Sequence, residues 1–253
     1  VFACALLNAQ PMGFYAPAQI VRDAREHGVE TRAVDVNASD WDTTLEPQAA
    51  PLPLHPHHVE MAGDIYATHA LRLGFRQIKG VHEDDMRRLV TRRGKGYDSV
   101  RDVWLRAELS PATLERLAEA DAFASLGLSR RDALWAATGL NRTGDKDDLP
   151  LLRELVFAPL EADAHLPPMP PGEEVVEDYR LLSLSLKGHP VSFLRSRLAP
   201  NILPCGRLSL MPDGDGRRVT VAGLVLLRQR PGTAKGVVFM TIEDETGAAN
   251  IIV

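Results

Sequence analysis

The sequence predicts an α+β protein, mostly helical at first and ending in the opening strands of a truncated β-barrel. Helix-capping residues and helical spacing recur within residues 2–27 and 80–140, whereas residues 219–253 alternate as strands do. With 253 residues, 45% of them hydrophobic and 25% charged, the chain is long enough for two or three globular domains. No apolar run reaches the ~18 residues of a membrane span, so we expect no membrane partner.

The N-terminal residues predict two helices followed by paired strands. Residues 2–9 and 17–27 have helical spacing, with a proline in the first turn of the second helix and Gly28 after its last turn. Thr31 to Val36 alternates like a strand, and Ala70 to Gly74 is a second strand that could pair with it. Residues 37–64, rich in Pro, Ala, Asp and His, are expected to form a surface excursion.

A helical block follows these strands. One helix is expected to open at Gly80 and run to about Arg93. Serine caps then predict three more, at Ser99 with Asp102, at Ser110 with Pro111, and at Ser129 with Asp132, the last of them ending at Gly139. Residues 109–125 resemble a degenerate hairpin that packs rather than binds.

The region between the helical block and the barrel predicts a linker and a helical pair. Residues 141–171 are polar and proline-rich, with one apolar island, LPLLRELVF at 149–157. That island predicts either a motif that docks a partner's groove or a cover for a neighbouring helix. Residues 173–186 and 190–198 are expected to be helices.

The last 35 residues have the strand order that opens an OB-fold. An alternating strand from Val219 leads into the basic turn RQRPGTAKG, a second strand ends in the acidic turn Asp244 to Gly247, and a third follows. We interpret the acidic turn as a tight turn rather than a metal site. OB-folds commonly hold single-stranded nucleic acid.

Positive charge is concentrated in two places although the net charge is −5. Residues 72–106 hold ten Lys or Arg against five acids, so this segment carries +5 and the remainder −10. Residues 217–235 hold five basic residues and no acid. Two basic islands in an acidic chain predict local phosphate contacts, with solvated helix faces as the alternative.

The first island contains a predicted duplex-binding hairpin at residues 77–82, QIKGVH. A glycine at the bend of an apolar hairpin lets backbone N–H groups approach a phosphate, and the following helix adds charge. This pattern resembles a helix-hairpin-helix element, although His82 stands where that motif has its second glycine, so a purely structural hairpin is the alternative. The predicted duplex ligands are Lys79, Gly80, Val81, Arg87, Arg88, Arg92, Arg93 and Lys95.

The second island predicts a single-strand site on the first hairpin of the barrel. Cations beside the turn would hold phosphates, and an aromatic ring on the next strand would stack with a base. The predicted residues are Arg228, Arg230, Lys235 and Phe239, and the alternative places Phe239 in the core.

No catalytic residue and no metal site is predicted in this chain. His55, His57 and His58 lie between prolines without a supporting acidic or Cys ligand, and no nucleophile–base pair stands out. Cys4 and Cys205 form no CxxC motif, which favours a reducing compartment, and we expect the protein to be cytoplasmic.

Four stretches resemble segments of one family, the bacterial C-family DNA polymerases. They are ALLNAQPMGFYAPAQIVRDAREHGVETRAVDVN, LRLGFRQIKGVHEDDMRRLV, DYRLLSLSLKGHPVSFLR and VTVAGLV…GVVFMTIEDETGAANIIV. The resemblance is strongest to the error-prone branch, through SDWDTTLEP, LSLSLKGHPVSFLR and RQRPGTAKGVVFMTIEDETG.

The resemblance implies template-directed DNA synthesis and translesion synthesis by a longer protein. Its catalytic palm, with Mg²⁺-binding carboxylates, would precede Val1, so we expect this segment to lack the catalytic centre and to need no cofactor of its own. The expected partner is primer–template DNA. The resemblance also implies a sliding clamp or an accessory Y-family-like protein as a further partner. The implied domains are the end of the fingers with the excursion (1–68), a helix-hairpin-helix region (69–140), a linker (141–171), a helical connector (172–215) and half of an OB-fold (216–253).

Two other functions stay open at this point. A non-catalytic repair or recombination protein could use the same hairpin and barrel to bind DNA. An RNA-binding OB module of a tRNA synthetase has similar first strands, although the stretch from Asn8 to Asn37 argues against it.

Overall fold

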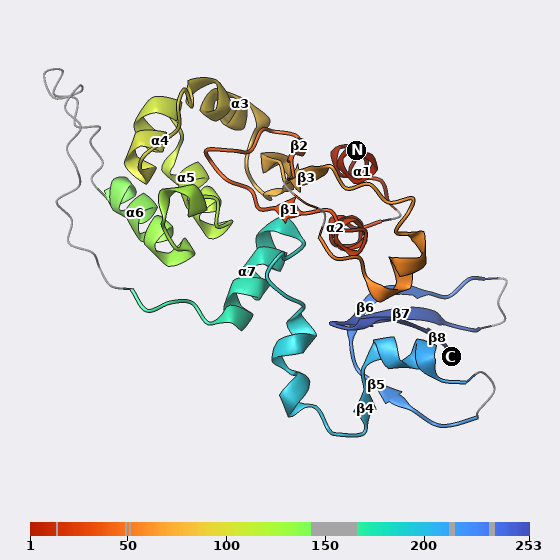
Figure 1. Ribbon diagram of the computed structural model, residues 1–253. Coiled ribbons are helices and arrows are strands. Elements are labelled where there is room, and N and C mark those ends of the chain that lie inside the picture. The colour runs from red at the N-terminus through yellow and green to blue at the C-terminus, as the bar shows by residue number, and fades with distance from the viewer. Residues whose placement is uncertain (14, 49, 51, 143–165, 213–215, 233–235) are drawn as a thin grey trace, which may run out of the picture. The chain divides into compact units, whose positions relative to one another are not determined.

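The computed structural model describes the whole chain except residues 14, 49, 51, 143–165, 213–215 and 233–235 (Figure 1). The chain forms two compact units, the first from residues 1–170 and 177–186 and the second from residues 171–176 and 187–253. Helices dominate the first unit and short strands the second, which confirms the α+β class. No helix in the described part of the chain is long and apolar enough to cross a membrane.

The first unit begins with two helices, α1 (Phe2–Asn8) and α2 (Pro17–Glu26), as predicted. Pro17 is the first residue of α2, and Gly28 follows the helix with φ +76°. A Cβ at Gly28 would lie 2.8 Å from the carbonyl oxygen of Leu52, so this glycine serves both the left-handed backbone and a close approach.

A three-stranded sheet follows, with β1 (Thr31–Arg32), β2 (Thr44–Pro47) and β3 (His69–Arg72) in the order β1-β3-β2. β3 pairs with β1 in parallel, which confirms the predicted pairing, and with β2 antiparallel. β1 is shorter than the predicted Thr31 to Val36. Within residues 37–64, the predicted surface excursion, Thr44–Pro47 form β2, an edge strand that the sequence did not predict.

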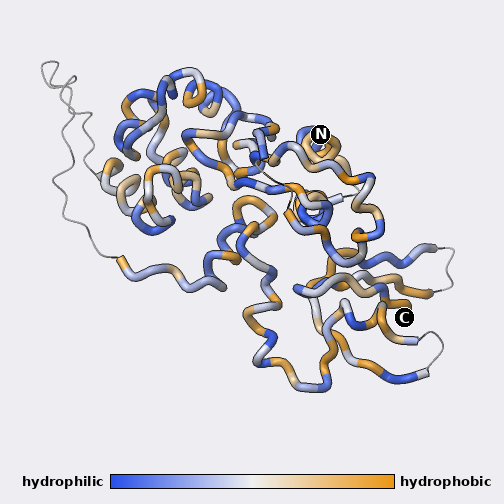
Figure 2. Tube along the Cα trace, viewed as in Figure 1, coloured by the Kyte–Doolittle hydropathy of each residue, from blue (hydrophilic) through white to orange (hydrophobic). Residues whose placement is uncertain are grey.

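The helical block comprises α3 (Glu83–Arg92), α4 (Val100–Ala107), α5 (Pro111–Glu119) and α6 (Arg130–Arg142). Ser99 and Ser110 cap α4 and α5 by accepting hydrogen bonds from the third helical residue, as predicted. α3 starts three residues after Gly80, and α6 continues through Gly139, where we had expected its end. Apolar residues at helical spacing alternate with polar ones along this block (Figure 2).

One hydrophobic core joins the sheet, the helical block and the end of α7 (Pro171–Leu182). Its fully buried members include Phe75, Leu89, Leu114, Phe123 and Leu181. The predicted linker falls largely on residues 143–165, which lie outside the described residues, and so does the LPLLRELVF island. The predicted domain boundaries stay predictions.

The second unit contains short helical turns and two sheets. Residues 190–193 and 195–197 form 3-10 turns in place of the second predicted helix. A third such turn, Cys205–Leu210, follows β4 (Ile202–Leu203), which pairs in parallel with β5 (Thr220–Val221).

The predicted barrel strands form an antiparallel sheet of β6 (Leu224–Gln229), β7 (Phe239–Asp244) and β8 (Gly247–Ile252). The first predicted strand is split in two at Gly223, where a Cβ would lie 2.4 Å from the carbonyl oxygen of Glu243. A small core of Cys205, Ile242 and Ala249 lies under the sheet, and residues 244–247 form the predicted tight turn.

Candidate nucleic-acid interface

The predicted hairpin at residues 77–82 is anchored in the hydrophobic core by one buried side chain and is exposed at its tip. Ile78 is 3% exposed and belongs to the core, whereas Lys79 and Gly80 are exposed. Gly80 has φ +85°, a left-handed conformation that glycine adopts without strain. No described residue accepts a hydrogen bond from the Gly80 N–H group, so this donor faces solvent at the bend.

Lys79 is tied to the end of α7. Its backbone N–H donates to the carbonyl oxygen of Leu181 at 2.9 Å, and its ammonium group donates to that of Arg180 at 3.1 Å. These bonds satisfy carbonyl groups in the last turn of α7 and seat the hairpin on that helix. Lys79 therefore positions the hairpin on α7, and the positive charge of Lys79 stays close to the hairpin.

The arginines of α3 form ion pairs on the helix surface. Arg87 pairs with Glu83, Arg88 with Asp85 and Arg92 with Glu108. The hydrogen bond that each guanidinium donates to its partner's carboxylate raises the pKa values of Arg87 and Arg92. Surface pairs of this kind are weak and exchangeable, so a phosphate can compete for these guanidinium groups.

The start of α3 carries negative charge. Glu83, Asp84 and Asp85 occupy its first turn, where carboxylates stabilise the helix dipole. The same charges oppose a phosphate at this helix end. An approaching backbone thus needs cations from elsewhere on the surface.

Arg93 differs from its neighbours because its side chain is only 15% exposed. Its guanidinium donates to the carbonyl oxygens of Val36, at 2.9 Å, and Ser39. Burial lowers its pKa, with the nearby Asp40 acting in the opposite direction. Arg93 ties α3 to the turn after β1, and its part in DNA binding stays a prediction.

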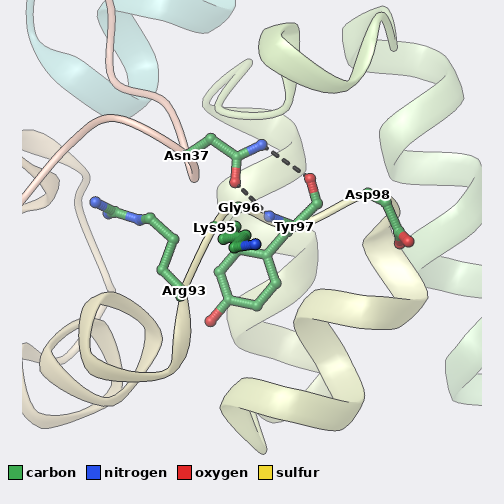
Figure 3. Close-up of a pocket in the computed structure, with 7 residues that line it drawn as sticks. Asn37, Arg93, Lys95, Gly96, Tyr97 and Asp98 are labelled. Carbon is green, nitrogen blue, oxygen red and sulfur yellow. Dashed lines mark hydrogen bonds between the residues drawn. The ribbon is translucent and has the colours of Figure 1, made fainter. Parts of the chain in front are cut away.

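Lys95 lies at the rim of a depression of about 380 Å³ (Figure 3). Gly94 and Gly96 flank it with φ +58° and +128°, so the loop bends tightly around an exposed cation. Asn37 clamps the loop by accepting from the Tyr97 N–H at 2.6 Å and donating to the Tyr97 carbonyl at 3.0 Å. No described residue forms an ion pair with Lys95, which leaves its ammonium group available to a phosphate.

Two arginines outside the predicted set contribute to this surface. Arg106 lies 4.6 Å above the ring of Tyr97 and donates to the carbonyl oxygens of Arg92, Arg93 and Gly96, so it holds the 93–97 loop in shape. Arg116 of α5 lies beside Gly80. Only tertiary packing brings Arg116 to the hairpin, and no local sequence signal indicated it.

The described residues of the predicted single-strand site, Arg228, Arg230 and Phe239, are exposed but do not share one face of the sheet. Arg228 lies opposite Met240 in the β6–β7 register, whereas Phe239 lies opposite Gln229. Neighbouring strand residues face opposite sides, so Arg228 and Phe239 point to different faces. Phe239 is 40% exposed and belongs to neither core cluster, which argues against the core alternative. Arg230 is exposed, and Lys235 lies outside the described residues.

His58 packs against the end of α2, and the backbone N–H of His55 donates to the carbonyl oxygen of Glu26 at 2.9 Å. The rings of His27 and His58 stack with centroids 4.1 Å apart, and His58 lies 3.8 Å from a carboxylate oxygen of Glu26. Within the described residues, no group of three or more His, Cys, Asp or Glu side chains could hold a metal ion.

Comparison with known proteins shows what this chain is similar to. The family model described as "Helix-hairpin-helix motif" matches residues 28–133, which include the hairpin and α3 to α5. All of the chain aligns with 23% of "Error-prone DNA polymerase 1" of Rhizobium meliloti (strain 1021) at 56% identity, and with 24% of "Error-prone DNA polymerase" of Caulobacter vibrioides at 52%. A relative of the same name from Ruegeria pomeroyi is 50% identical, with 21% of it covered. The chain spans about a quarter of the length of these relatives. Over its whole length the chain is homologous to one segment of the error-prone DNA polymerases, which confirms the family predicted from its sequence.

Proposed function

We propose that this chain is the DNA-binding portion of an error-prone DNA polymerase. The observation that carries the proposal is the alignment of the whole chain with such polymerases at 50–56% identity, together with the helix-hairpin-helix match. In the longer protein, this portion would hold primer–template DNA during template-directed synthesis, including synthesis across damaged template. We expect that protein to act in the cytoplasm, where Cys4 and Cys205 stay reduced.

The duplex would bind along the hairpin and the exposed cations of α3 and the following loop. Arg87, Arg92 and Lys95 are exposed on this part of the first unit, and the N–H of Gly80 faces solvent. Such contacts reach phosphates rather than base edges, so they hold DNA independently of sequence. This property suits a polymerase, which must bind every template.

The single-stranded template would bind the sheet of the second unit. Arg228 and Arg230 offer charge on one face near the end of β6, and Phe239 offers a ring on the other. The strand would place phosphates near the arginines and stack a base on Phe239 across the sheet edge.

Nucleotide transfer itself would need groups outside this chain. We infer that Mg²⁺ and its carboxylate ligands belong to the part of the protein that precedes this segment. A sliding clamp or an accessory Y-family-like protein would recruit the longer protein through contacts that we leave unassigned.

Fluorescence anisotropy with the 253-residue chain tests this proposal. We expect primer–template DNA to bind more tightly than tRNA of equal length in nucleotides. The chain alone should not extend a primer, whereas the longer protein that contains it should do so with Mg²⁺ and deoxynucleoside triphosphates. A preference for tRNA, or a longer protein unable to extend a primer, would contradict the proposal.

A double variant, Arg87→Gln with Lys95→Gln, tests which surface carries the duplex. Each lost phosphate contact makes the slope of log K against log salt less negative by about 0.9, so we expect the magnitude of the slope to fall by roughly 2 and binding to every duplex sequence to weaken. Arg207→Gln is the matched control, because Arg207 is exposed but lies outside both basic islands. An unchanged slope in the double variant would exclude this surface.

A further inference from the structure

A guanidinium group from α5 lies beside the bend of the hairpin. A Cβ built on Gly80 would lie 3.6 Å from Nε and 3.9 Å from Cδ of Arg116. Arg116 comes from a different helix, 36 positions further along the chain. Its side chain is 44% exposed, so the group is open to solvent next to the free Gly80 N–H.

A shared carboxylate fixes the position of this guanidinium. Glu119 pairs through one oxygen with Arg116 at 3.0 Å and through the other with Arg180 at 3.1 Å. The carbonyl oxygen of Arg180 also accepts a hydrogen bond from the ammonium group of Lys79. Three cations from three segments therefore meet around one hairpin, against the carboxylates of Glu119 and Glu177.

We infer that Arg116 is a phosphate ligand of the Lys79–Gly80 hairpin, supplied by α5 and positioned by Glu119. This inference rests on the proposed function, since the ligand is a phosphodiester of bound DNA. One phosphate oxygen would accept from the Gly80 N–H, which it can approach because glycine has no Cβ. A second oxygen would accept from the planar fork of the guanidinium, a geometry that suits phosphate.

The local charges explain why the hairpin needs this arginine. The helix that follows the hairpin begins with Glu83, Asp84 and Asp85. Its own arginines are paired with carboxylates of α3 and with Glu108, the residue after α4. His82 stands in place of the second glycine of the motif. At that position the hairpin presents a side chain, whereas a glycine would leave the backbone open to a phosphate. Arg116 brings positive charge to the bend from outside this acidic turn.

The test uses two substitutions in the 253-residue chain, one that removes a positive charge and one that removes a negative charge. A short DNA duplex is the probe. Arg116→Gln removes the ligand. We expect about tenfold weaker binding, because one charged hydrogen bond is lost, and a slope of log K against log salt that is less negative by about 0.9. Glu119→Gln keeps a side-chain oxygen that can still accept a hydrogen bond from Arg116 and position it, but removes the negative charge that competes with the phosphate. We therefore expect binding a few-fold tighter with the slope unchanged. Thermal unfolding checks that both variants stay folded.

The Arg22–Glu26 pair supplies matched controls. It is also a helical ion pair, with Arg22 39% exposed, and lies on α2 rather than beside the hairpin. Arg22→Gln and Glu26→Gln should leave duplex affinity within twofold of wild type. Should Arg116→Gln not fold, Arg116→Lys replaces it: we expect weaker binding with an unchanged slope, because the charge remains and the fork is lost.

The outcomes separate this inference from the proposed function. If Arg116→Gln and Glu119→Gln both bind like wild type while the Arg87/Lys95 double variant binds weakly, the inference is overturned and the proposed function stands. The same holds if Arg116→Lys replaces Arg116→Gln and binds like wild type. If the wild-type chain does not bind duplex DNA with a salt-dependent affinity, the proposed function and the inference both fail.

Discussion

Adjacent arginines in this chain have different environments and hence different roles. Arg92 is exposed and pairs with Glu108, whereas Arg93 is directed into the protein and donates to two carbonyl oxygens. Arg106 caps the end of α3 through the carbonyl oxygens of Arg92 and Arg93 and also donates to that of Gly96 in the following loop. A count of positive charges therefore overstates the number of phosphate ligands in the 72–106 island.

The buried pair of Arg130 and Asp178 gives a stability prediction. Their side chains are 2% and 6% exposed, and the pair joins α6 to α7. Arg130→Met leaves a buried carboxylate without its cation, so we expect the free energy of unfolding to fall by about 3–5 kcal/mol. Urea denaturation measures it. Arg87→Met, which breaks an exposed pair, should lower the free energy of unfolding far less, and similar losses in the two variants would contradict the prediction.

Asp244 gives a prediction of pH dependence in the second unit. Burial tends to raise its pKa, but hydrogen bonds from Thr246, from the Cys205 N–H and from Arg195 outweigh burial and lower the pKa to about 2, from 3.8. Because the folded pKa is depressed, the stabilisation is complete above about pH 4 and is lost as the pH falls through 2. It amounts to about 2 kcal/mol.

Hydrogen exchange at the amides of β7 measures this effect in wild type and in Asp244→Asn. The asparagine variant should be less stable at pH 6, and the difference should narrow between pH 4 and pH 2. A difference that stays constant over this range would contradict the assignment to Asp244.

At the scale of elements, Gly74 lets two segments meet under the hairpin. A Cβ there would lie 2.3 Å from the carbonyl carbon of Asp42, although the backbone of Gly74 is an ordinary extended one with φ −86°. The packing of the loop before β2 against the start of the hairpin therefore needs a residue without a side chain.

Gly74→Ala should lower the free energy of unfolding by about 2 kcal/mol or more, because the backbone of residues 41–42 has to move. Gly139→Ala is the control, since no described atom outside the backbone of α6 and the neighbouring residues lies within 4 Å of the new methyl group. This second substitution should stabilise by up to about 1 kcal/mol, because alanine favours a helix. Thermal denaturation of both variants checks the sign, and equal shifts would contradict the steric argument.

At the scale of the whole molecule, an acidic chain would bind DNA through a few local cations. We count Arg87, Arg92, Lys95 and Arg116 as cations open to phosphate near the hairpin. Four contacts give a slope of log K against log salt of about −3.6 for duplex DNA. A slope near −9 would correspond to ten contacts. It would show that the buried and carbonyl-bound arginines leave their partners in the protein and also bind phosphates. Titration between 50 and 200 mM salt, by anisotropy, measures it.

The sequence by itself determined the features that depend on neighbouring residues. Serine caps and Pro17 marked helix starts, and alternation from Val219 together with the turns that follow it marked the strands of the last sheet, because these signals act within a few residues. The family was also readable, since stretches such as LSLSLKGHPVSFLR are distinctive without any structure. The split of the first barrel strand at Gly223 was not readable, because it depends on contact with Glu243 of the neighbouring strand.

Tertiary structure alone decided which cations face solvent and what lies beside the hairpin. Arg93 meets carbonyl oxygens 54 and 57 positions away, and Arg116 reaches Gly80 from another helix. β2 forms only because Thr44 to Pro47 finds β3 as a partner. The physical reason is the same in each case: the charge pairing, burial and strand pairing of a residue are set by neighbours that the folded chain brings from far along its sequence.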